Sequence, residues 1–396
     1  MRFPEFTDEW KESVLSDFVE RVKRKNKNNL CKLPLTISAQ YGLVDQISFF
    51  NKVIASENMS NYYLLHKGDF AYNKSYSSEY PWGAIKRLDC YEQGTLSSLY
   101  ICFKPYSHVS SDFLTHYFET SKWHQGISEI AVEGARNHGL LNVGIQDFFE
   151  TRHCLPQSLL EQEKIAKFLN LIEERIATQN KIIEKYESLI QAMCDTLIES
   201  EQHKVELAFS DFGKSYSGLS GKSAEDFGEG CPYITYMNVY QNQIIDATNV
   251  GLVKINGAEQ QSVVHYGDIL FTLSSETAEE VGMGAVYLGD TYPLYLNSFC
   301  FGIHIIDDNK IFPPFLAFYV STKSFRKVVF PLAQGSTRFN LQKNDFMKKG
   351  FSFPTVERQR KIYSALKTYS DKLSVEKSIA KLLCKQKNHL LSQLFI

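Results

Sequence analysis

Two segments place arginine close to asparagine, two residue types that can each make paired hydrogen bonds to a flat partner. The segments are Arg136-Asn137 and Arg338-Phe339-Asn340. Arginine can bind the edge of guanine in this way, and asparagine the edge of adenine. A turn stabilised by the asparagine is the alternative. The two segments therefore suit base recognition without requiring it.

Other basic, polar and aromatic residues could contact a nucleic acid from loops. The run from Lys23 to Lys25 is as consistent with a solvated loop as with phosphate contacts. Polar loops later in the chain carry hydroxyl groups that can hydrogen-bond to base edges and phosphates. The full set of candidates for DNA contact is Lys23, Arg24, Lys25, Lys74, Tyr76, Ser77, Trp82, Lys86, Arg87, Arg136, Asn137, Ser274, Ser275, Thr277, Arg338, Asn340 and Lys343.

Motifs for catalysis are missing from the sequence. Phe312-Pro313-Pro314-Phe315 resembles an adenine-methyltransferase motif but lacks its leading amide or carboxylate. There is no Walker loop, and Val281–Gly284 is better explained as a turn. We expect no catalytic residue and no cofactor. A DNA-modifying enzyme with a concealed site remains an alternative.

Metal binding is also not expected. His66, His265 and His304 are each interpreted as isolated histidines. The eight cysteines are scattered and form no C-x-x-C pair, so they are better explained as free thiols than as zinc ligands or disulfides.

Charge and hydropathy limit the class of protein. The net charge of −2 is weak evidence against a nucleic-acid partner, because such proteins usually carry a basic surface. The sequence contains no run of 18 apolar residues, so we expect no membrane span, and the N-terminal residues do not form a signal peptide.

The chain is an internal duplication with an offset of about 200 residues. Six matches occur in the same order in both halves. They pair Lys67–Phe70 with Tyr266–Ile269, Phe113–Tyr117 with Phe315–Tyr319, Gly134–Asn137 with Gly335–Arg338, Asp147-Phe148 with Asp345-Phe346, Pro156 with Pro354, and Gln162–Ile165 with Gln359–Ile362. The common order makes chance similarity a poor explanation.

A long helix is predicted at the end of each copy, because apolar residues recur at alternating steps of four and three. Each seam spans 33 residues, which is about 50 Å of helix. The first seam is Ile165, Leu169, Ile172, Ile176, Gln179, Ile183, Ile190 and Leu197; the second is Ile362, Leu366, Leu373, Glu376, Leu383, Leu390 and Leu394, with Lys387 also on it.

We expect these two helices to pack antiparallel as a coiled coil, with Gln179 near Glu376. Residues 156–204 contain 6 Lys/Arg and 9 Asp/Glu, whereas residues 354–396 contain 9 and 3. Opposite charges beside a seam favour a pair of unlike helices. The alternative is that each helix packs only on its own domain.

The fold class expected is α/β (α+β), with two similar mixed domains separated by the two long helices and related by a pseudo-two-fold repeat. The boundaries are 1–155 for the first domain, 156–204 for the first helix, 205–353 for the second domain and 354–396 for the second helix. Strands are expected near 98–103, 264–271 and 299–305, and helices near 111–123 and 313–328.

Five segments resemble the specificity (S) subunits of type I restriction-modification systems. They are MRFPEFTDEWK at the start, KGDFAYNKSY at 67–76, EQEKIAKFL at 161–169, QRKI at 359–362 and LLSQLF at 390–395. The resemblance covers the whole chain in the order of its parts, and the helix motifs are the most specific.

The resemblance implies a non-catalytic role in a bacterial or archaeal cytoplasm. Two target-recognition domains would each read half of a bipartite, asymmetric site in double-stranded DNA, and the paired helices would set their spacing. The implied partners are methyltransferase subunits, two in number, and restriction/translocase subunits that join through them. A protein-interaction scaffold that does not bind DNA is the second alternative.

Overall fold

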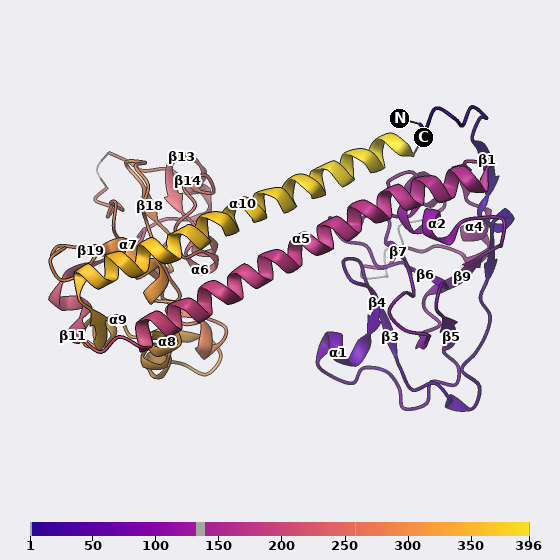
Figure 1. Cartoon of the computed structure of the whole chain (residues 1–396). Helices are drawn as coiled ribbons and strands as arrows, with labels where there is room; N and C mark the ends of the chain where they lie inside the picture. Colours follow the sequence, from indigo (N-terminus) through magenta and orange to yellow (C-terminus); the bar gives the residue numbers. More distant parts are fainter. Residues whose placement is uncertain (1, 132–138, 258, 396) are drawn as a thin grey trace. The chain divides into compact units, whose positions relative to one another are not determined.

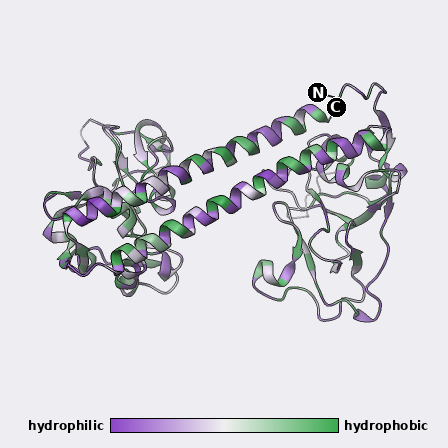
Figure 2. Ribbon diagram, viewed as in Figure 1, coloured by the Kyte–Doolittle hydropathy of each residue, from purple (hydrophilic) through white to green (hydrophobic). Residues whose placement is uncertain are grey.

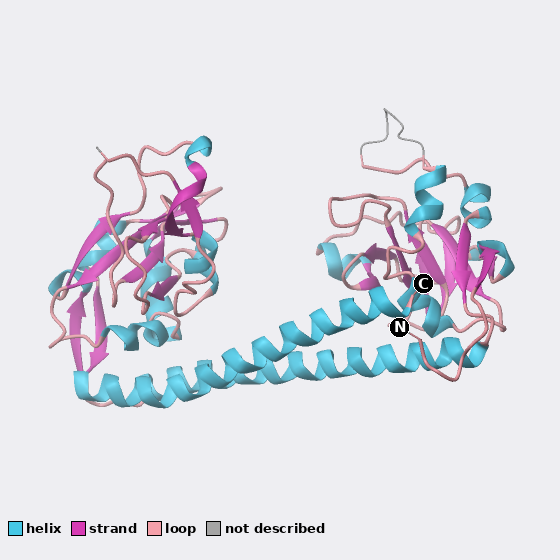
Figure 3. Ribbon diagram, turned by 90° about the horizontal axis from the view of Figure 1, so that it is seen from above, coloured by secondary structure: helices cyan, strands magenta, loops and turns pink. Residues whose placement is uncertain are grey.

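The chain divides into two units in this computed structural model, which describes residues 2–131, 139–257 and 259–395. Unit 1 comprises Met1–Gln179 and Ile379–Ile396, and unit 2 comprises Asn180–Ser378. Each unit has a globular body of mixed strands and short helices (Figure 3) and part of each of two long helices (Figure 1). The long helices are α5 (Leu159–Glu199) and α10 (Val356–Leu394).

The body of unit 1 contains ten strands and four short helices among the described residues. In chain order these are β1 (Lys11–Val14), β2 (Val19–Arg21), β3 (Leu35–Ser38), β4 (Gly42–Asp45), α1 (Gln46–Phe50), β5 (Tyr63–His66), β6 (Phe70–Asn73), β7 (Ala84–Arg87), β8 (Gln93–Leu96), β9 (Ile101–Pro105), α2 (Ser111–Tyr117), α3 (His124–Ile130), α4 (Ile145–Glu150) and β10 (Arg152–Leu155).

The body of unit 2 follows α5. Its elements are β11 (Lys204–Ala208), β12 (Gly213–Ser217), β13 (Phe227–Ile234), α6 (Tyr236–Gln241), β14 (Gly251–Val253), β15 (Ile269–Thr272), β16 (Ser274–Ser275), β17 (Gly284–Val286), β18 (Tyr295–Leu296), β19 (Cys300–Ile305), α7 (Pro313–Tyr319), α8 (Lys323–Val329), β20 (Ala333–Gln334), β21 (Phe339–Leu341), α9 (Lys343–Lys348) and β22 (Gly350–Pro354).

The two bodies have the same central sheet. Its strand order is β2-β9-β6-β7 in unit 1 and β12-β19-β15-β17 in unit 2, with every neighbouring pair antiparallel. The register also corresponds, because Phe70 lies opposite Phe103 in one sheet and Ile269 opposite Ile303 in the other. A second antiparallel pair, β1 with β10 or β11 with β22, joins the start of each body to its end. The repeat seen in the sequence is thus a repeat of topology.

Aromatic side chains fill the core of each body, and both long helices close it. In unit 1 the stacked rings of Phe70 and Phe103 lie in the same cluster as Leu169 of α5 and Leu394 of α10. In unit 2 the rings around Phe209 share a cluster with Ile190, Cys194 and Ile198 of α5 and with Ile362 and Leu366 of α10. Removing this apolar surface from water is the main force that holds the helices to each body.

Within each unit α5 and α10 run side by side in opposite directions (Figure 1), and hydrophobic positions recur along both (Figure 2). All fifteen residues of the expected seam are buried or half-buried. Ion pairs accompany the seam: Lys387 Nζ lies 2.6 Å from Glu173 Oε1 in unit 1, and Lys377 Nζ lies 2.7 Å from Glu187 Oε1 in unit 2. Lys387 therefore occupies its seam position by reaching a carboxylate on the other helix.

A buried glutamine near the start of each long helix explains the best sequence match between the copies. The Gln162 side chain donates to the Pro156 carbonyl (2.8 Å) and accepts from the Ser110 amide at the start of α2 (2.9 Å). Gln359 donates to the Pro354 carbonyl (2.8 Å) and accepts from the Phe312 amide at the start of α7 (2.8 Å). A glutamine side-chain amide at the equivalent position thus connects the long helix to the body in both units.

The expected elements differ from the observed ones mainly at their ends. α5 and α10 begin two or three residues after the expected starts, and β11 takes over at Lys204. The expected helix at 313–328 divides into two helices of seven residues, α7 and α8. The expected helix at 111–123 is shorter, since only α2 lies within it and the next helix, α3, begins at His124. In the described ranges, none of the helices combines the length and apolar character that crossing a membrane requires.

Candidate nucleic-acid interface

Unit 2 has a pocket of about 340 Å³ beside one end of its central sheet. Its walls come from α6, from the segment at β16, from the turn before β19 and from the residue before β21. The lining residues are Tyr236, Met237, Tyr240, Ser274, Ser275, Glu276, Glu280, Phe299 and Arg338. Three of these, Ser274, Ser275 and Arg338, are among the residues proposed from the sequence for DNA contact.

Hydrogen bonds fix a carboxylate in this pocket. Tyr240 donates its hydroxyl to Glu280 Oε1 (2.6 Å), and Ser275 donates to Glu280 Oε2 (3.1 Å). The bond from Tyr240 is the main cause that lowers the pKa of Glu280 below its usual value. The carboxylate is therefore an acceptor at neutral pH, with the chemistry that accepts from the exocyclic amine of cytosine.

Flat groups and one cation complete the unit 2 pocket. The rings of Tyr236 and Tyr240 are stacked, with centroids 6.0 Å apart. The Phe299 ring is 56% exposed, and Arg338 is exposed. Aromatic faces can stack on bases, and a guanidinium can bind guanine or a phosphate. Together these groups can recognise the edge and the face of a base.

Unit 1 has a smaller pocket, of about 270 Å³, at the corresponding place. It is lined by Asn73, Lys74, Ser75, Ser98, Leu99, Tyr100, Leu140, Leu141 and Asn142. Lys74 is the residue here that was proposed from the sequence. Because this pocket offers asparagine amides and a lysine where the other offers glutamates and an arginine, the two pockets present different hydrogen-bonding groups.

Backbone pairing establishes that the pockets are equivalent. The Leu141 amide donates to the Lys74 carbonyl (2.9 Å) in unit 1, as the Leu341 amide donates to the Leu273 carbonyl (2.8 Å) in unit 2. The next residue along pairs in both cases, Ser75 with Leu140 and Ser274 with Asn340. Leu99 is 72% exposed and is equivalent to Phe299. Leu99 lies two residues before Ile101, which pairs with β6, and Phe299 lies two residues before Phe301, which pairs with β15.

Unit 1 has another pocket, of about 500 Å³, which is lined by Ser16, Arg21, Lys23, Ile145, Gln146, Phe149 and Glu150. Lys23 is exposed there. The pocket lies between the edge strand β2 and α4, and its two cations suit phosphate contact more than base contact.

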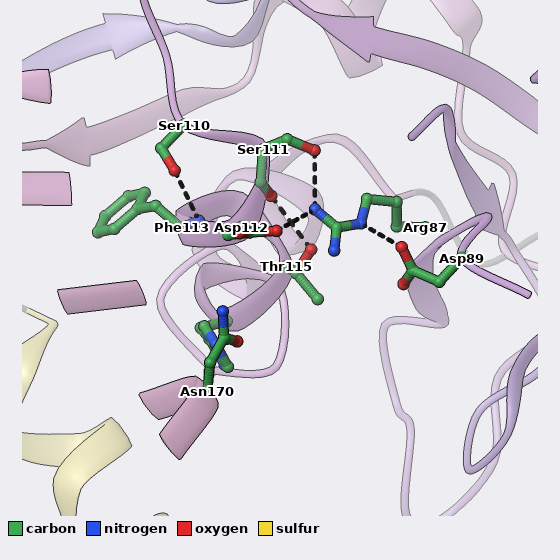
Figure 4. Close-up of polar contacts among 9 residues, drawn as sticks. Arg87, Asp89, Ser110, Ser111, Asp112, Phe113, Thr115 and Asn170 are labelled. Atoms are coloured by element: carbon green, nitrogen blue, oxygen red, sulfur yellow. Dashed lines mark hydrogen bonds and ion pairs between the residues drawn. The ribbon is translucent and has the colours of Figure 1, made fainter. Parts of the chain in front are cut away.

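Several cations proposed from the sequence are held by carboxylates of unit 1. Arg87 is only 17% exposed and donates to Asp89 (2.7 Å), Asp112 (2.6 Å) and Ser111 (2.9 Å), as Figure 4 shows. Lys86 pairs with Glu119, and Arg24 pairs with the buried Asp69. These three side chains neutralise acidic groups of their own unit, which leaves them poorly placed for a phosphate.

The remaining candidates lie outside the two equivalent pockets. Lys25 covers the Tyr63 ring, and Trp82 packs against the core of unit 1. Tyr76 and Ser77 are exposed in the loop after β6, and Thr277 is exposed after β16. Asn340 is exposed in β21, while Lys343 at the start of α9 reaches Ser217 (3.5 Å). Arg136 and Asn137 lie outside the described residues.

Sequence reasoning missed the aromatic and acidic parts of these pockets. Tyr236, Tyr240 and Glu280 carry no motif, although the spacing of the tyrosines places them on one face of α6. Leu99 and Phe299 could have been found as apolar residues just before corresponding strands.

The structure also corrects the interpretation of two histidines as isolated. The side-chain donor atoms of His265, Asp268 and His304 all lie within 4.8 Å of one another. His304 is in β19 and the other two precede β15, so the pairing of these strands brings them together. His66, the counterpart of His265, lies at the end of β5.

The duplicated body, the paired helices and the two unlike pockets define a class of protein with two recognition modules in one chain. Residues 210–383 match the family model of the type I restriction modification DNA specificity domain. A specificity domain is a recognition module and not a catalytic one. The resemblance seen in the sequence is thereby confirmed.

Solved structures extend the likeness to the whole chain. One is a chain of a type I R-M system studied for its complex assembly and conformational transition; it is 15% identical, with a TM-score of 0.56, and 98% of this chain and 97% of that chain are covered. Another is the type I restriction-modification S subunit from M. genitalium, also 15% identical, with a TM-score of 0.54 and coverage of 100% and 99%. The chain therefore has the fold of an S subunit. No curated protein sequence is significantly similar to it.

Proposed function

We propose that this chain is the specificity subunit of a type I restriction-modification complex and reads a bipartite, asymmetric DNA site. Each unit reads one half of the site. The observation that carries the proposal is the pair of pockets at equivalent places with different linings. Equivalent places give both units the same approach to a duplex, and different linings give them different base preferences.

The chemistry of each pocket supports a separate preference. Glu280 and Arg338 in unit 2 can accept from cytosine and donate to guanine. Asn73, Asn142 and Lys74 in unit 1 can pair with adenine and with guanine acceptors. The pockets therefore favour unlike half-sites.

The resemblance to S subunits implies the partners, and the low charge of the chain is consistent with them. A net charge of −2 gives little attraction for a polyanion. We infer that methyltransferase subunits, two in number, supply most phosphate contacts and carry out base flipping and methylation in the cytoplasm. Restriction/translocase subunits join through that complex. The chain positions these enzymes and transfers no group itself.

A gel-shift titration of the chain with its methyltransferase partner tests this function. The proposal predicts a complex with a subset of duplexes that is much tighter than with random DNA, by the 10³-fold or more typical of specific binding. Binding that ignores base sequence would favour the protein scaffold. Methylation by the purified chain without any partner would favour the enzyme.

A further inference from the structure

A turn in unit 2 brings two histidines and an aspartate to one side of the central sheet. His265 and Asp268 lie in the turn before β15, and His304 lies near the end of β19. His304 Nδ1 is 2.9 Å from Asp268 Oδ1, and the donor atoms of all three residues lie within 4.8 Å of one another. This is the one such group among the residues in the described ranges.

The carboxylate and one imidazole are held in fixed orientations. Asp268 is buried, and its Oδ2 accepts from the Tyr216 hydroxyl (2.8 Å) and from the His265 amide (2.8 Å). Oδ1 is thereby turned towards His304. The Tyr216 ring stacks on the His304 ring with centroids 4.3 Å apart, which fixes the imidazole plane. Such outer contacts are what orient the ligands of a metal ion.

The corresponding place in unit 1 is occupied by an internal cation. Asp69 accepts from the His66 amide (2.8 Å) in the same turn, but the Arg24 guanidinium pairs with its carboxylate. The strand register makes Arg21 equivalent to Ser215, and counting on three residues makes Arg24 equivalent to Gly218. A Cβ at Gly218 would lie 2.0 Å from the Asn297 carbonyl oxygen. Unit 2 therefore has no arginine at this point, and its buried carboxylate faces two imidazoles.

We propose that Asp268, His304 and His265 bind a divalent first-row metal ion, with zinc favoured. Ligand bonds to zinc are about 2.0–2.2 Å long, so two donors 2.9 Å apart can share one ion at an angle near 90°. His265 is exposed and can rotate to become the third ligand, and water completes the coordination. Imidazole donors favour zinc over magnesium or calcium.

The ion would fasten the turn at 265–268 to β19. In its absence these segments are joined by the hydrogen bond from His304 to Asp268 and by the contact between the His265 and His304 rings. The ion replaces the hydrogen bond with bonds to all three ligands. The metal site lies just before the first residue of β15, whereas Ser274 of the pocket lies just after its last residue. The proposal is thus independent of how the pocket is used.

Isothermal titration of the metal-stripped full-length chain with Zn²⁺ tests the site, using protein without a histidine tag. We expect one saturable site per chain. The His265→Ala/His304→Ala variant should lose at least tenfold in affinity, and Tyr216→Phe should lose about 10–100-fold because it frees the carboxylate. His66→Ala is the matched control and should bind as the parent does.

Substitution of Co²⁺ for zinc distinguishes the ligands. The proposal predicts a cobalt spectrum without the thiolate charge-transfer band and an increase in the melting temperature that the His265→Ala/His304→Ala variant lacks. A thiolate band would assign the ion to one of the free cysteines. That outcome, equal binding by the histidine variant, or no saturable binding by the parent chain would each overturn the proposal.

Discussion

Two buried glutamine side chains each join a long helix to its body through hydrogen bonds, two for Gln162 and three for Gln359. Leucine at position 359 would leave the Pro354 carbonyl and the Phe312 amide without their partner. Because an unsatisfied buried group costs about 1–3 kcal/mol, Gln359→Leu should lower the free energy of unfolding by that amount. Urea denaturation measures it. Gln202→Leu, at an exposed position, is the control and should change stability by less than about 0.5 kcal/mol.

The buried histidine of unit 1 makes its stability depend on pH. Burial lowers the pKa of His153 to about 4, and its two ring nitrogens bond to the Tyr117 and Thr151 hydroxyls. The unfolded chain binds a proton near pH 6.5, whereas the folded chain does not. The stabilisation from keeping His153 neutral is therefore complete above about pH 6.5. As the pH falls towards 4, the free energy of unfolding decreases by up to about 3 kcal/mol. Burial also lowers the pKa of His116, which acts in the same direction.

Urea denaturation of unit 1 between about pH 7 and pH 4.5 checks this dependence against His153→Asn. The variant should be less stable at neutral pH but should change less with acid, since it has no imidazole to protonate at that position. Parallel pH profiles for the two proteins would show that His153 does not control the acid sensitivity.

At the scale of single residues, the sequence showed which residues recur in motifs but did not predict which groups they contact. The repeated Gln-x-Lys-Ile motif was visible, but the bonds of its glutamine were not. Arg24, Lys86 and Arg87 were plausible phosphate ligands until the fold placed carboxylates beside them. Those partners lie 45, 33 and 25 residues away in the chain, or as near as two residues for Asp89. Only tertiary structure makes the three distant pairs.

At the scale of elements the long helices were the most predictable feature. An apolar period of 3.5 sustained over 33 residues has few structural solutions, and every seam residue of α5 and α10 is at least half-buried. The short helices were less predictable, because threonine side chains bond to the helix ends: Thr120 donates to the Tyr117 carbonyl at the end of α2, and Thr322 donates to the Tyr319 carbonyl and begins α8. Local turn chemistry decided those boundaries.

Packing, rather than charge, should hold α10 to α5. Leu169→Ala removes a fully buried side chain in unit 1 and should cost about 2–5 kcal/mol. Lys387→Ala removes the half-exposed ion pair with Glu173 and should cost less than about 1 kcal/mol. Denaturation of both variants and of Glu173→Ala with Lys387→Ala measures the difference. A larger loss for the lysine variant would mean that the ion pair sets the stability of the helix pair.

At the scale of the whole molecule the duplication was predictable and the recognition surfaces only partly so. Collinear matches define two copies, and Ser274, Ser275, Arg338 and Lys74, four of the residues proposed for DNA contact, line the equivalent pockets. The tyrosines of α6 were not predicted because none of the matches between the two copies includes them. Divergence is expected where two modules have different targets.

The central claim is that each unit reads its own half of a DNA site. Its most direct test is selection from random duplexes by the complex with the methyltransferase partner, followed by sequencing, for the parent chain, for Arg338→Ala and for Lys74→Ala. Loss of a base contact costs about 1–3 kcal/mol of discrimination, or roughly 5–150-fold in preference. The account predicts that Arg338→Ala relaxes the preference in one half of the site only and Lys74→Ala in the other half only. Relaxation of the same half by both variants, or an unchanged site in both, would contradict it.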